Sequence, residues 1–260
     1  MESKRNKLDM LIAMKVRYSA LFLAISLAIG TTQTIMSAYG QGNNPGVYSK
    51  ESSPFDIPYS EWIHRWWQWN TGTPTSIHPR DNFTEQKCTS NQNGPVWFLP
   101  DILTGKEERT CTIPAGKAII VPLLTGDCHN DGTPPIMDDD ELRKCAKEGD
   151  EFGAISATLD GQKIQNLESY RTQTGFYNIT VVKGNVFGNV PGTFKGNADG
   201  FFVFLEPPSV GKHDLRLTTS VTNPTTPTYN YAAEVLYHLI ISPKSNNGAN
   251  INQTNQSVTS

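Results

Sequence analysis

The chain has 260 residues, of which 37% are hydrophobic and 18% charged, a composition typical of a folded protein with room for one good core. Its net charge is −3, so it lacks the basic excess with which proteins neutralise nucleic-acid phosphates, and nucleic acid is not an expected partner. The 21 Gly and 17 Pro residues, with frequent Thr and β-branched residues, favour strands joined by turns.

The first forty residues have the pattern of an export signal. Basic residues precede an apolar run at residues 19–30, and these 12 residues fall short of the roughly 20 that a membrane-spanning helix needs. We interpret residues 1–40 as a signal peptide, and an uncleaved membrane anchor is the alternative. The protein is therefore expected to be secreted or at the cell surface, with membrane contact only through an uncleaved signal.

The four cysteines predict two disulfides, because exported proteins meet an oxidising compartment. None of them forms a C-x-x-C pair, which argues against a zinc knuckle or a thioredoxin-like redox site. Three pairings are open. We favour Cys88 with Cys111 and Cys128 with Cys145, since each pair closes a turn-rich segment, a closure worth about 3 kcal/mol in the chain-entropy treatment.

Residues 58–70 contain four tryptophans and predict an amphipathic helix. At about 100° per residue, Trp62, Trp66 and Trp69 share one face and Trp67 lies beside them. Such a face most often covers the open side of a sheet, so we expect the rings to be core residues. The alternative is a ligand-binding platform on which these four rings stack against a glycan.

The remaining sequence alternates short β-rich runs with turns. This spacing predicts an all-β fold, mainly an antiparallel β-sandwich or jelly roll, with one or two short helices. The domain is expected at residues 57–242, between a flexible lead-in at 41–56 and a disordered Asn-rich tail at 243–260. Strands are expected at residues 96–99, 109–113, 117–124, 154–159, 176–182, 201–205, 214–219 and 231–241.

Local signals refine this arrangement. The Asp160-Gly161 pair predicts a two-residue hairpin turn, and Pro122 predicts an edge position or a bulge because it has no N–H to donate. A short helix is expected at residues 138–150, whose acidic start and basic end suit the helix dipole.

The segment from Asp127 to Asp138 is the sharpest local candidate for chemistry. Aligned with a calcium loop, Asp127 takes position 1, Asp131 position 5, Gly132 the sharp turn and Asp138 position 12. His129 stands where an oxygen ligand is wanted. We interpret the segment as an acidic loop held by a disulfide and expect no cofactor. The alternative is a site for calcium or another hard cation, formed by Asp127, His129, Asp131 and Asp138.

Familiar catalytic motifs are missing from the sequence. It contains no G-x-S-x-G elbow, H-E-x-x-H helix, phosphate-binding G-x-x-x-x-G-K-[ST] loop or G-x-G-x-x-G fingerprint. A glycosidase needs only two suitably placed carboxylates. For that activity the candidates are Glu61, Asp127, Asp131 and Glu206.

Four N-x-[ST] sequons make the chain a candidate glycoprotein in an organism that N-glycosylates exported proteins. In an Asn- and Thr-rich chain such sequons also arise by chance. They lie at Asn82, Asn178, Asn252 and Asn255.

The motifs W-x3-WWQW, GPVWFLP, RTCTIPAGKAIIVPL and LEPPSVGKHDLRL together resemble a loosely defined group of secreted bacterial and archaeal proteins. That group has a Trp-rich early helix, a GPVWFL strand and a late PP-x2-GKH turn. The resemblance covers about residues 59–241. It implies export, and it implies no activity, cofactor or catalytic residue.

Taken together, these features predict a secreted or cell-surface binding or structural module, with a glycan or another cell-envelope component as its candidate partner. Two other hypotheses remain. One is a secreted hydrolase that acts on a polysaccharide or envelope polymer, and the other is a calcium- or metal-binding surface protein.

The export hypothesis predicts cleavage after Gly40, where Ala38 and Gly40 form a small-x-small site; a second such site ends at Gly30. Amino-terminal sequencing of protein made in an exporting host should begin at Gln41. A full-length chain recovered with the membrane fraction would support the anchored alternative instead.

Overall fold

The computed structural model describes residues 44–101, 104–133, 135–148, 153–222 and 230–243. The expected signal peptide lies outside the described residues, as do Asn252, Asn255 and nearly all of the expected tail. No helix in the described ranges combines the length and apolar character needed to cross a membrane.

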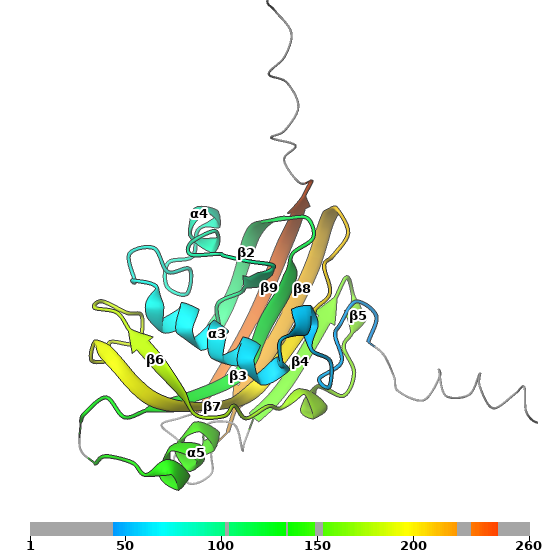
Figure 1. The fold of residues 1–260 in the computed structure, drawn as a ribbon. Coiled ribbons are helices and arrows are strands. Elements are labelled where there is room, and N and C mark those ends of the chain that lie inside the picture. Colours follow the sequence, from blue (N-terminus) through cyan, green and yellow to red (C-terminus); the bar gives the residue numbers. More distant parts are fainter. Residues whose placement is uncertain (1–43, 102–103, 134, 149–152, 223–229, 244–260) are drawn as a thin grey trace, which may run out of the picture. The chain divides into compact units, whose positions relative to one another are not determined.

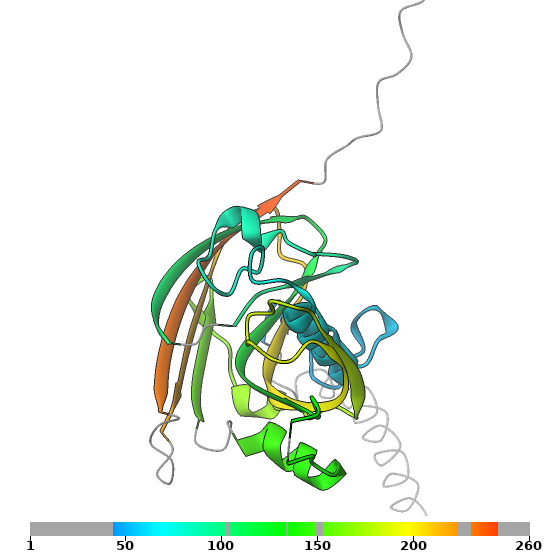
Figure 2. The same cartoon turned by 90° about the vertical axis from the view of Figure 1, so that its left-hand side faces the viewer.

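Two sheets make up most of the domain, and they face each other in Figures 1 and 2. The four-stranded sheet has the order β1 (Val96–Phe98), β3 (Ala118–His129), β7 (Gly192–Leu205), β6 (Tyr177–Val181). The five-stranded sheet has the order β2 (Gly105–Pro114), β9 (Tyr231–Ser242), β8 (Gly211–Val221), β4 (Gly153–Leu159), β5 (Gln162–Lys163).

Most strand pairs are antiparallel, and the β1–β3 and β2–β9 pairs are parallel. The expected all-β, mainly antiparallel fold with short helices is therefore confirmed. Several strands are longer than expected. β7 begins at Gly192, β2 begins at Gly105, and β3 continues to His129.

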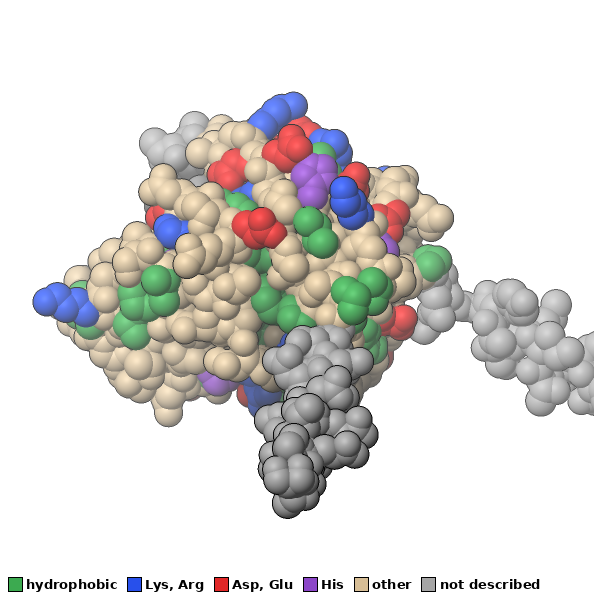
Figure 3. Space-filling model, turned by 90° about the horizontal axis from the view of Figure 1, so that it is seen from above, with side chains coloured by type: hydrophobic (Ala, Val, Ile, Leu, Met, Phe, Trp, Pro, Cys, Tyr) green, Lys and Arg blue, Asp and Glu red, His purple; other side chains and the backbone are tan. Residues whose placement is uncertain are grey.

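The five-stranded sheet has an apolar inner face and a charged outer face. In β9, alternate residues from Ala233 to Ile241 are buried, as the sequence pattern predicts. On the outer face, the His238 ring contacts Glu108 of β2 at 2.6 Å and Asp214 of β8 at 2.7 Å. Seen from above, acidic, basic and histidine side chains gather along this side of the molecule (Figure 3).

The Trp-rich helix α3 (Tyr59–Gly72) lies in the curl of the four-stranded sheet (Figures 1 and 2). Its Trp66 ring is completely buried, packs 5.3 Å from the Phe202 ring of β7, and donates its Nε1–H to the Leu99 carbonyl at 2.8 Å. The expected core role of the tryptophans is what the structure shows. The helix starts after Pro58 and ends at Gly72, two residues beyond the expected range of 58–70.

Four shorter helical segments complete the described fold: η1 (Pro54–Asp56), α4 (Glu85–Cys88), α5 (Asp139–Glu148) and η2 (Leu167–Tyr170). The expected second helix corresponds to α5, and α4 has no counterpart in the sequence predictions. α5 packs closely on β3 at Gly126, where an added Cβ would lie 2.3 Å from the Ala146 carbonyl oxygen. The missing side chain is thus what lets the helix approach the strand.

Both predicted disulfides are present. Cys88 at the end of α4 is joined to Cys111 of β2, and Cys128 of β3 is joined to Cys145 of α5. In Figure 1, α4 and α5 lie at opposite ends of the domain, so the two crosslinks restrain different regions.

Two local turn predictions are also confirmed. Asp160 and Gly161 have φ values of 51° and 77°, the left-handed geometry of a hairpin turn that matches strand twist. The β3–β7 register shifts between Pro122 and Leu124, so the proline lies at an irregularity inside the sheet. The described part of the lead-in packs on β7, where Val47 forms a bridge with Leu205.

The burial of Trp66 predicts that Trp66→Ala lowers the free energy of unfolding by about 3 to 5 kcal/mol, as for other large-to-small core changes. Urea unfolding followed by circular dichroism measures this loss. Trp66→Phe keeps most of the ring volume and should cost less. An unchanged unfolding midpoint for Trp66→Ala would contradict the core role.

Candidate functional site

The four tryptophans do not form an exposed platform. All four are buried: Trp62, Trp66, Trp67 and Trp69. The Nε1–H of Trp62 donates to the Pro54 carbonyl at 2.9 Å. Trp69 differs from the others because it borders a pocket at the C-terminal end of α3. This pocket is our candidate ligand-binding site.

The pocket has a volume of about 350 Å³ and lies between α3 and the segment that leads into β1. This volume is within the range of small-molecule sites, which begins at about 300 Å³. Its lining combines aromatic rings with amide, hydroxyl and guanidinium groups, from Arg65, Gln68, Trp69, Gly72, Thr73, Asn91, Asn93 and Phe98.

Two aromatic residues form the floor of the pocket. The Trp69 and Phe98 rings lie 5.8 Å apart and are inclined by 47°. They are only 6% and 8% exposed, so only a small part of each side chain is accessible from the pocket. The Nε1–H of Trp69 donates to the Ser90 carbonyl at 3.1 Å, which ties the floor to the neighbouring segment.

Hydrogen bonds fix the polar rim. The Gln68 amide pairs with both backbone groups of Thr180, at 2.9 Å for each bond, and so covers the outer edge of β6. Asn91 donates through Nδ2 to the Thr73 hydroxyl oxygen at 3.1 Å. Among the described residues, the Asn93 amide has no hydrogen-bond partner. The Asn91 carbonyl oxygen and the Asn93 amide therefore supply both acceptors and donors for a ligand.

Buried polar residues pack next to Trp69 on its core side and bind one another. His78 lies 5.0 Å from the Trp69 ring, and its Nδ1 accepts the backbone N–H of Arg80 at 3.0 Å. Arg109 donates to the Arg80 carbonyl at 3.2 Å and to the Tyr237 hydroxyl at 2.9 Å. Burial, together with the positive charges of Arg80, Lys87 and Arg109, lowers the pKa of His78 to about 3.

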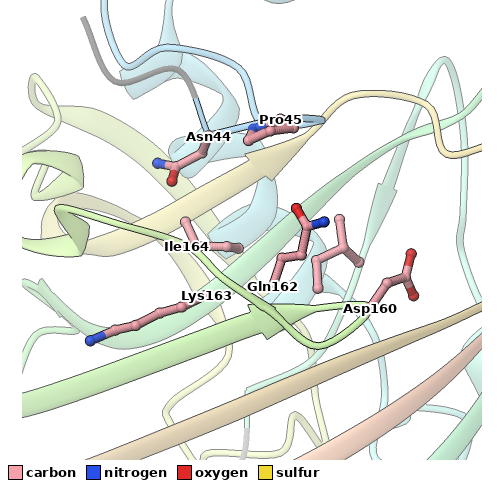
Figure 4. Close-up of a pocket in the computed structure, with 7 residues that line it drawn as sticks. Asn44, Pro45, Asp160, Gln162, Lys163 and Ile164 are labelled. Carbon is pink, nitrogen blue, oxygen red and sulfur yellow. The ribbon is translucent and has the colours of Figure 1, made fainter.

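A second pocket, of about 220 Å³, lies at the β4–β5 hairpin. Figure 4 shows its lining, in which the Lys163 side chain extends away from Asp160. Its polar groups already have structural roles: Asn44 binds the backbone of Gln165, and Asp160 accepts the backbone N–H of Asp214 at 2.8 Å. This pocket is therefore a weaker candidate for a ligand.

The residues of the alternative calcium site each have a different partner. Asp127 accepts a hydrogen bond from the Tyr177 hydroxyl and contacts the His129 ring at 2.7 Å. Asp131 accepts the backbone N–H of Thr133, and Asp138 accepts two backbone N–H groups at the start of α5. Within the described residues, no group of three His, Cys, Asp or Glu side chains gathers in a way that could hold a metal ion.

The Asp127–His129 contact shows how this end of β3 is built instead. Burial by itself lowers the pKa of His129, but the hydrogen bond and the negative charge of Asp127 outweigh it and leave that pKa raised. The His129 ring also stacks at 5.7 Å on Phe194 of β7. The pair thus joins β3 to β7 close to the Cys128–Cys145 disulfide.

The candidate hydrolase carboxylates either pair with other side chains or lie outside the two pockets. Glu61 pairs with Arg65 at 3.0 Å and with His64 at 3.3 Å, while Asp127 is bound as described above. Asp131 and Glu206 are exposed or half-buried, and neither lines one of the two pockets. Of the described sequons, Asn82 is exposed in a turn before α4, and Asn178 is exposed on β6.

Sequence reasoning missed Asn91, Asn93 and Phe98 as site residues. They lie more than twenty positions from Trp69, and the GPVWFLP motif that contains Phe98 implies no binding role. One signal was present, because the favoured pairing of Cys88 with Cys111 anchors the chain just before Asn91. That signal alone does not indicate which face of α3 the segment meets.

No protein-family model matches the chain, and no curated protein matches it. Among solved structures, a crystal structure of a variant of CfaE, the CFA/I adhesin of enterotoxigenic E. coli, matches 46% of this chain with 12% identity and a TM-score of 0.13. The match spans 36% of the length of that solved chain. A likeness at this TM-score carries no argument about fold or function.

The low pKa of His78 predicts an acid-sensitive contribution to stability. Unfolding returns this imidazole to its ordinary pKa of 6.5, so its contribution is complete above pH 6.5 and is lost as the pH falls toward 3. Between pH 7 and pH 4 the loss from His78 should be about 3 kcal/mol.

The matched variant is His78→Asn, whose side-chain oxygen can still accept the Arg80 N–H but does not titrate. Its free energy of unfolding should fall less than that of the wild type over this pH interval, as measured by urea unfolding at both values. Identical falls in the two proteins would contradict the assignment.

Proposed function

We propose that this protein is an exported binding module that holds a glycan of the cell envelope, or of its surroundings, in the pocket beside α3. The observation that carries the proposal is the lining of that pocket. It combines the accessible parts of Trp69 and Phe98 with amide and hydroxyl groups.

Sugar rings present apolar C–H faces and many hydroxyl groups, each of which both donates and accepts hydrogen bonds. Amide side chains match these hydroxyls because each amide offers an acceptor and two donors. Asn91 and Asn93 provide such groups on one wall, and the Thr73 hydroxyl lies between that wall and α3. The accessible aromatic carbons offer apolar contact to the C–H groups of the ring.

Two features support a role outside the cytosol. The chain has two disulfides, which form and persist mainly in oxidising compartments. Its first forty residues also have the pattern of an export signal, which supports secretion or cell-surface attachment as part of the proposal.

Binding is a better match to this geometry than hydrolysis. A glycosidase acts through two carboxyl groups that flank the scissile bond. The described lining of the pocket supplies aromatic, amide, hydroxyl and guanidinium groups, and Glu61, the nearest candidate carboxylate along α3, is paired with Arg65.

The proposal predicts that purified protein sediments with an insoluble glycan when it is tested against peptidoglycan sacculi, chitin and cellulose. The Asn91→Ala/Asn93→Ala variant should bind the glycan that sediments with the wild type at least tenfold more weakly than the wild type does. This expectation rests on about 1 kcal/mol for each lost hydrogen bond, with about 1.4 kcal/mol corresponding to a factor of ten.

Gln162→Ala is the matched control, because Gln162 is an exposed amide residue that lines the other pocket. It should bind as the wild type does. Equal losses in both variants would move the site away from α3, and new reducing ends released from the glycan would favour the hydrolase hypothesis. Wild-type protein that binds none of the three glycans would contradict the proposal.

A further inference from the structure

The outer wall of the candidate pocket is a short irregular segment, residues 89–95, which connects α4 to β1. Asn91 and Asn93 of this wall line the pocket, and the Ser90 carbonyl accepts the hydrogen bond from Trp69. The wall therefore determines both the width of the pocket and the place of its amide groups. What holds the wall in position also controls the site.

The first anchor of the wall is Cys88, which immediately precedes it. Cys88 is completely buried and is joined to Cys111 in β2, which is completely buried as well. Beside this crosslink, Glu85 of α4 accepts a hydrogen bond from the Thr112 hydroxyl of β2 at 2.5 Å. The start of the wall is thus fixed to the five-stranded sheet.

The Gln92 side chain connects Cys88 with Phe98 of the pocket floor by hydrogen bonds. Its Nε2 donates to the Cys88 carbonyl at 3.3 Å and to the Phe98 carbonyl at 2.8 Å, and its Oε1 accepts the Phe98 N–H at 2.9 Å. One amide therefore connects the crosslinked residue with a floor residue of the pocket. A displacement of Cys88 removes the reference point for Gln92 and for Asn91 and Asn93 beside it.

The second disulfide has no such connection. Cys128 and Cys145 join β3 to α5, and α5 lies at the end of the domain opposite α4 in Figures 1 and 2. Neither cysteine lines the pocket. The chain therefore contains its own matched control for the effect of losing a disulfide.

We propose that Cys88 and Cys111 are positioning residues for the glycan site, and that the pocket takes its binding-competent form only when they are joined. This inference rests on the proposed function. In the joining step, the two thiols react by thiol–disulfide exchange with an external disulfide such as oxidised glutathione. The protein gains one S–S bond and loses two hydrogens, and the oxidant becomes two thiols. The site is thereby completed in an oxidising compartment, after export.

The expected rise in the dissociation constant follows from the fraction of molecules whose wall is in the binding-competent position. Without the crosslink the wall samples several positions, and the apparent dissociation constant rises by the inverse of the fraction that is competent. A wall that is competent one tenth of the time or less weakens binding by about tenfold or more. The number of binding sites per folded molecule stays the same.

The experiment compares Cys88→Ala/Cys111→Ala with Cys128→Ala/Cys145→Ala and the wild type. Alanine suits the first pair because both positions are buried. Each protein is titrated with chitohexaose and with soluble peptidoglycan fragments, well below its unfolding temperature. The first variant should show a dissociation constant raised at least tenfold with unchanged stoichiometry, and the second should match the wild type. A simple loss of folded protein would lower the stoichiometry instead.

A ligand-free measurement separates this inference from the proposed function. The Trp69 indole N–H signal in NMR reports its hydrogen bond to Ser90, and backbone order parameters report the motion of residues 89–94. Both should change in Cys88→Ala/Cys111→Ala and remain as in the wild type in Cys128→Ala/Cys145→Ala. If the wild type binds neither probe nor cellulose, the proposed function fails and these signals still decide the positioning role. Unchanged signals in the first variant, or equal binding by both variants, would overturn it. If the first variant does not fold, Cys128→Ala/Cys145→Ala is compared in its oxidised and reduced forms, which differ only in the Cys88–Cys111 crosslink.

Discussion

The burial of one aromatic helix face against a curled sheet is the constraint on which the rest of the domain depends. The Trp66 ring packs edge-on against Phe202 and gives its N–H to the Leu99 carbonyl, so a large apolar group is buried without an unsatisfied donor at that point. Trp62 does the same with Pro54 on the preceding turn. These bonds fix the position of α3 along the sheet as well as its burial. Whatever lies at the end of α3 therefore has a defined place relative to β1 and β6.

The candidate site depends on that fixed position. Trp69 lies one turn beyond Trp66 on the same face, near the segment before β1, and this core residue also lines the pocket. The opposite wall comes from a different part of the chain and is held through Cys88. Binding groups on irregular segments need such rigid support, because each unrestrained residue would lose conformational entropy when a ligand binds. A helix and a crosslinked segment together provide it.

Much of the fold could be predicted from the sequence, because periodicity reports burial directly. The alternation from Ala233 to Ile241 and the turn at Asp160 and Gly161 are local signals, and the structure bears them out. Strand ends were less predictable. β2 begins at Gly105 with exposed charged residues, and β7 begins at Gly192 with glycines between its apolar residues, so neither end has an apolar alternation. Those ends are strands because a partner strand satisfies their backbone groups, which a local pattern does not record.

The sequence by itself determined the all-β class, the amphipathic helix and the favoured cysteine pairing, because each follows from the spacing of residues close together in the chain. Only the tertiary structure decided which tryptophan meets a pocket and which acidic residues stay apart. Asp127 and Asp138 match a calcium loop in spacing, yet the strand carries Asp127 toward Tyr177 while Asp138 caps α5. Asn91 and Trp69 line the same pocket although they belong to segments more than twenty residues apart in the chain. Local spacing sets which way a side chain faces along its own element, whereas a site is made by the contacts between elements, and those depend on how the whole core packs.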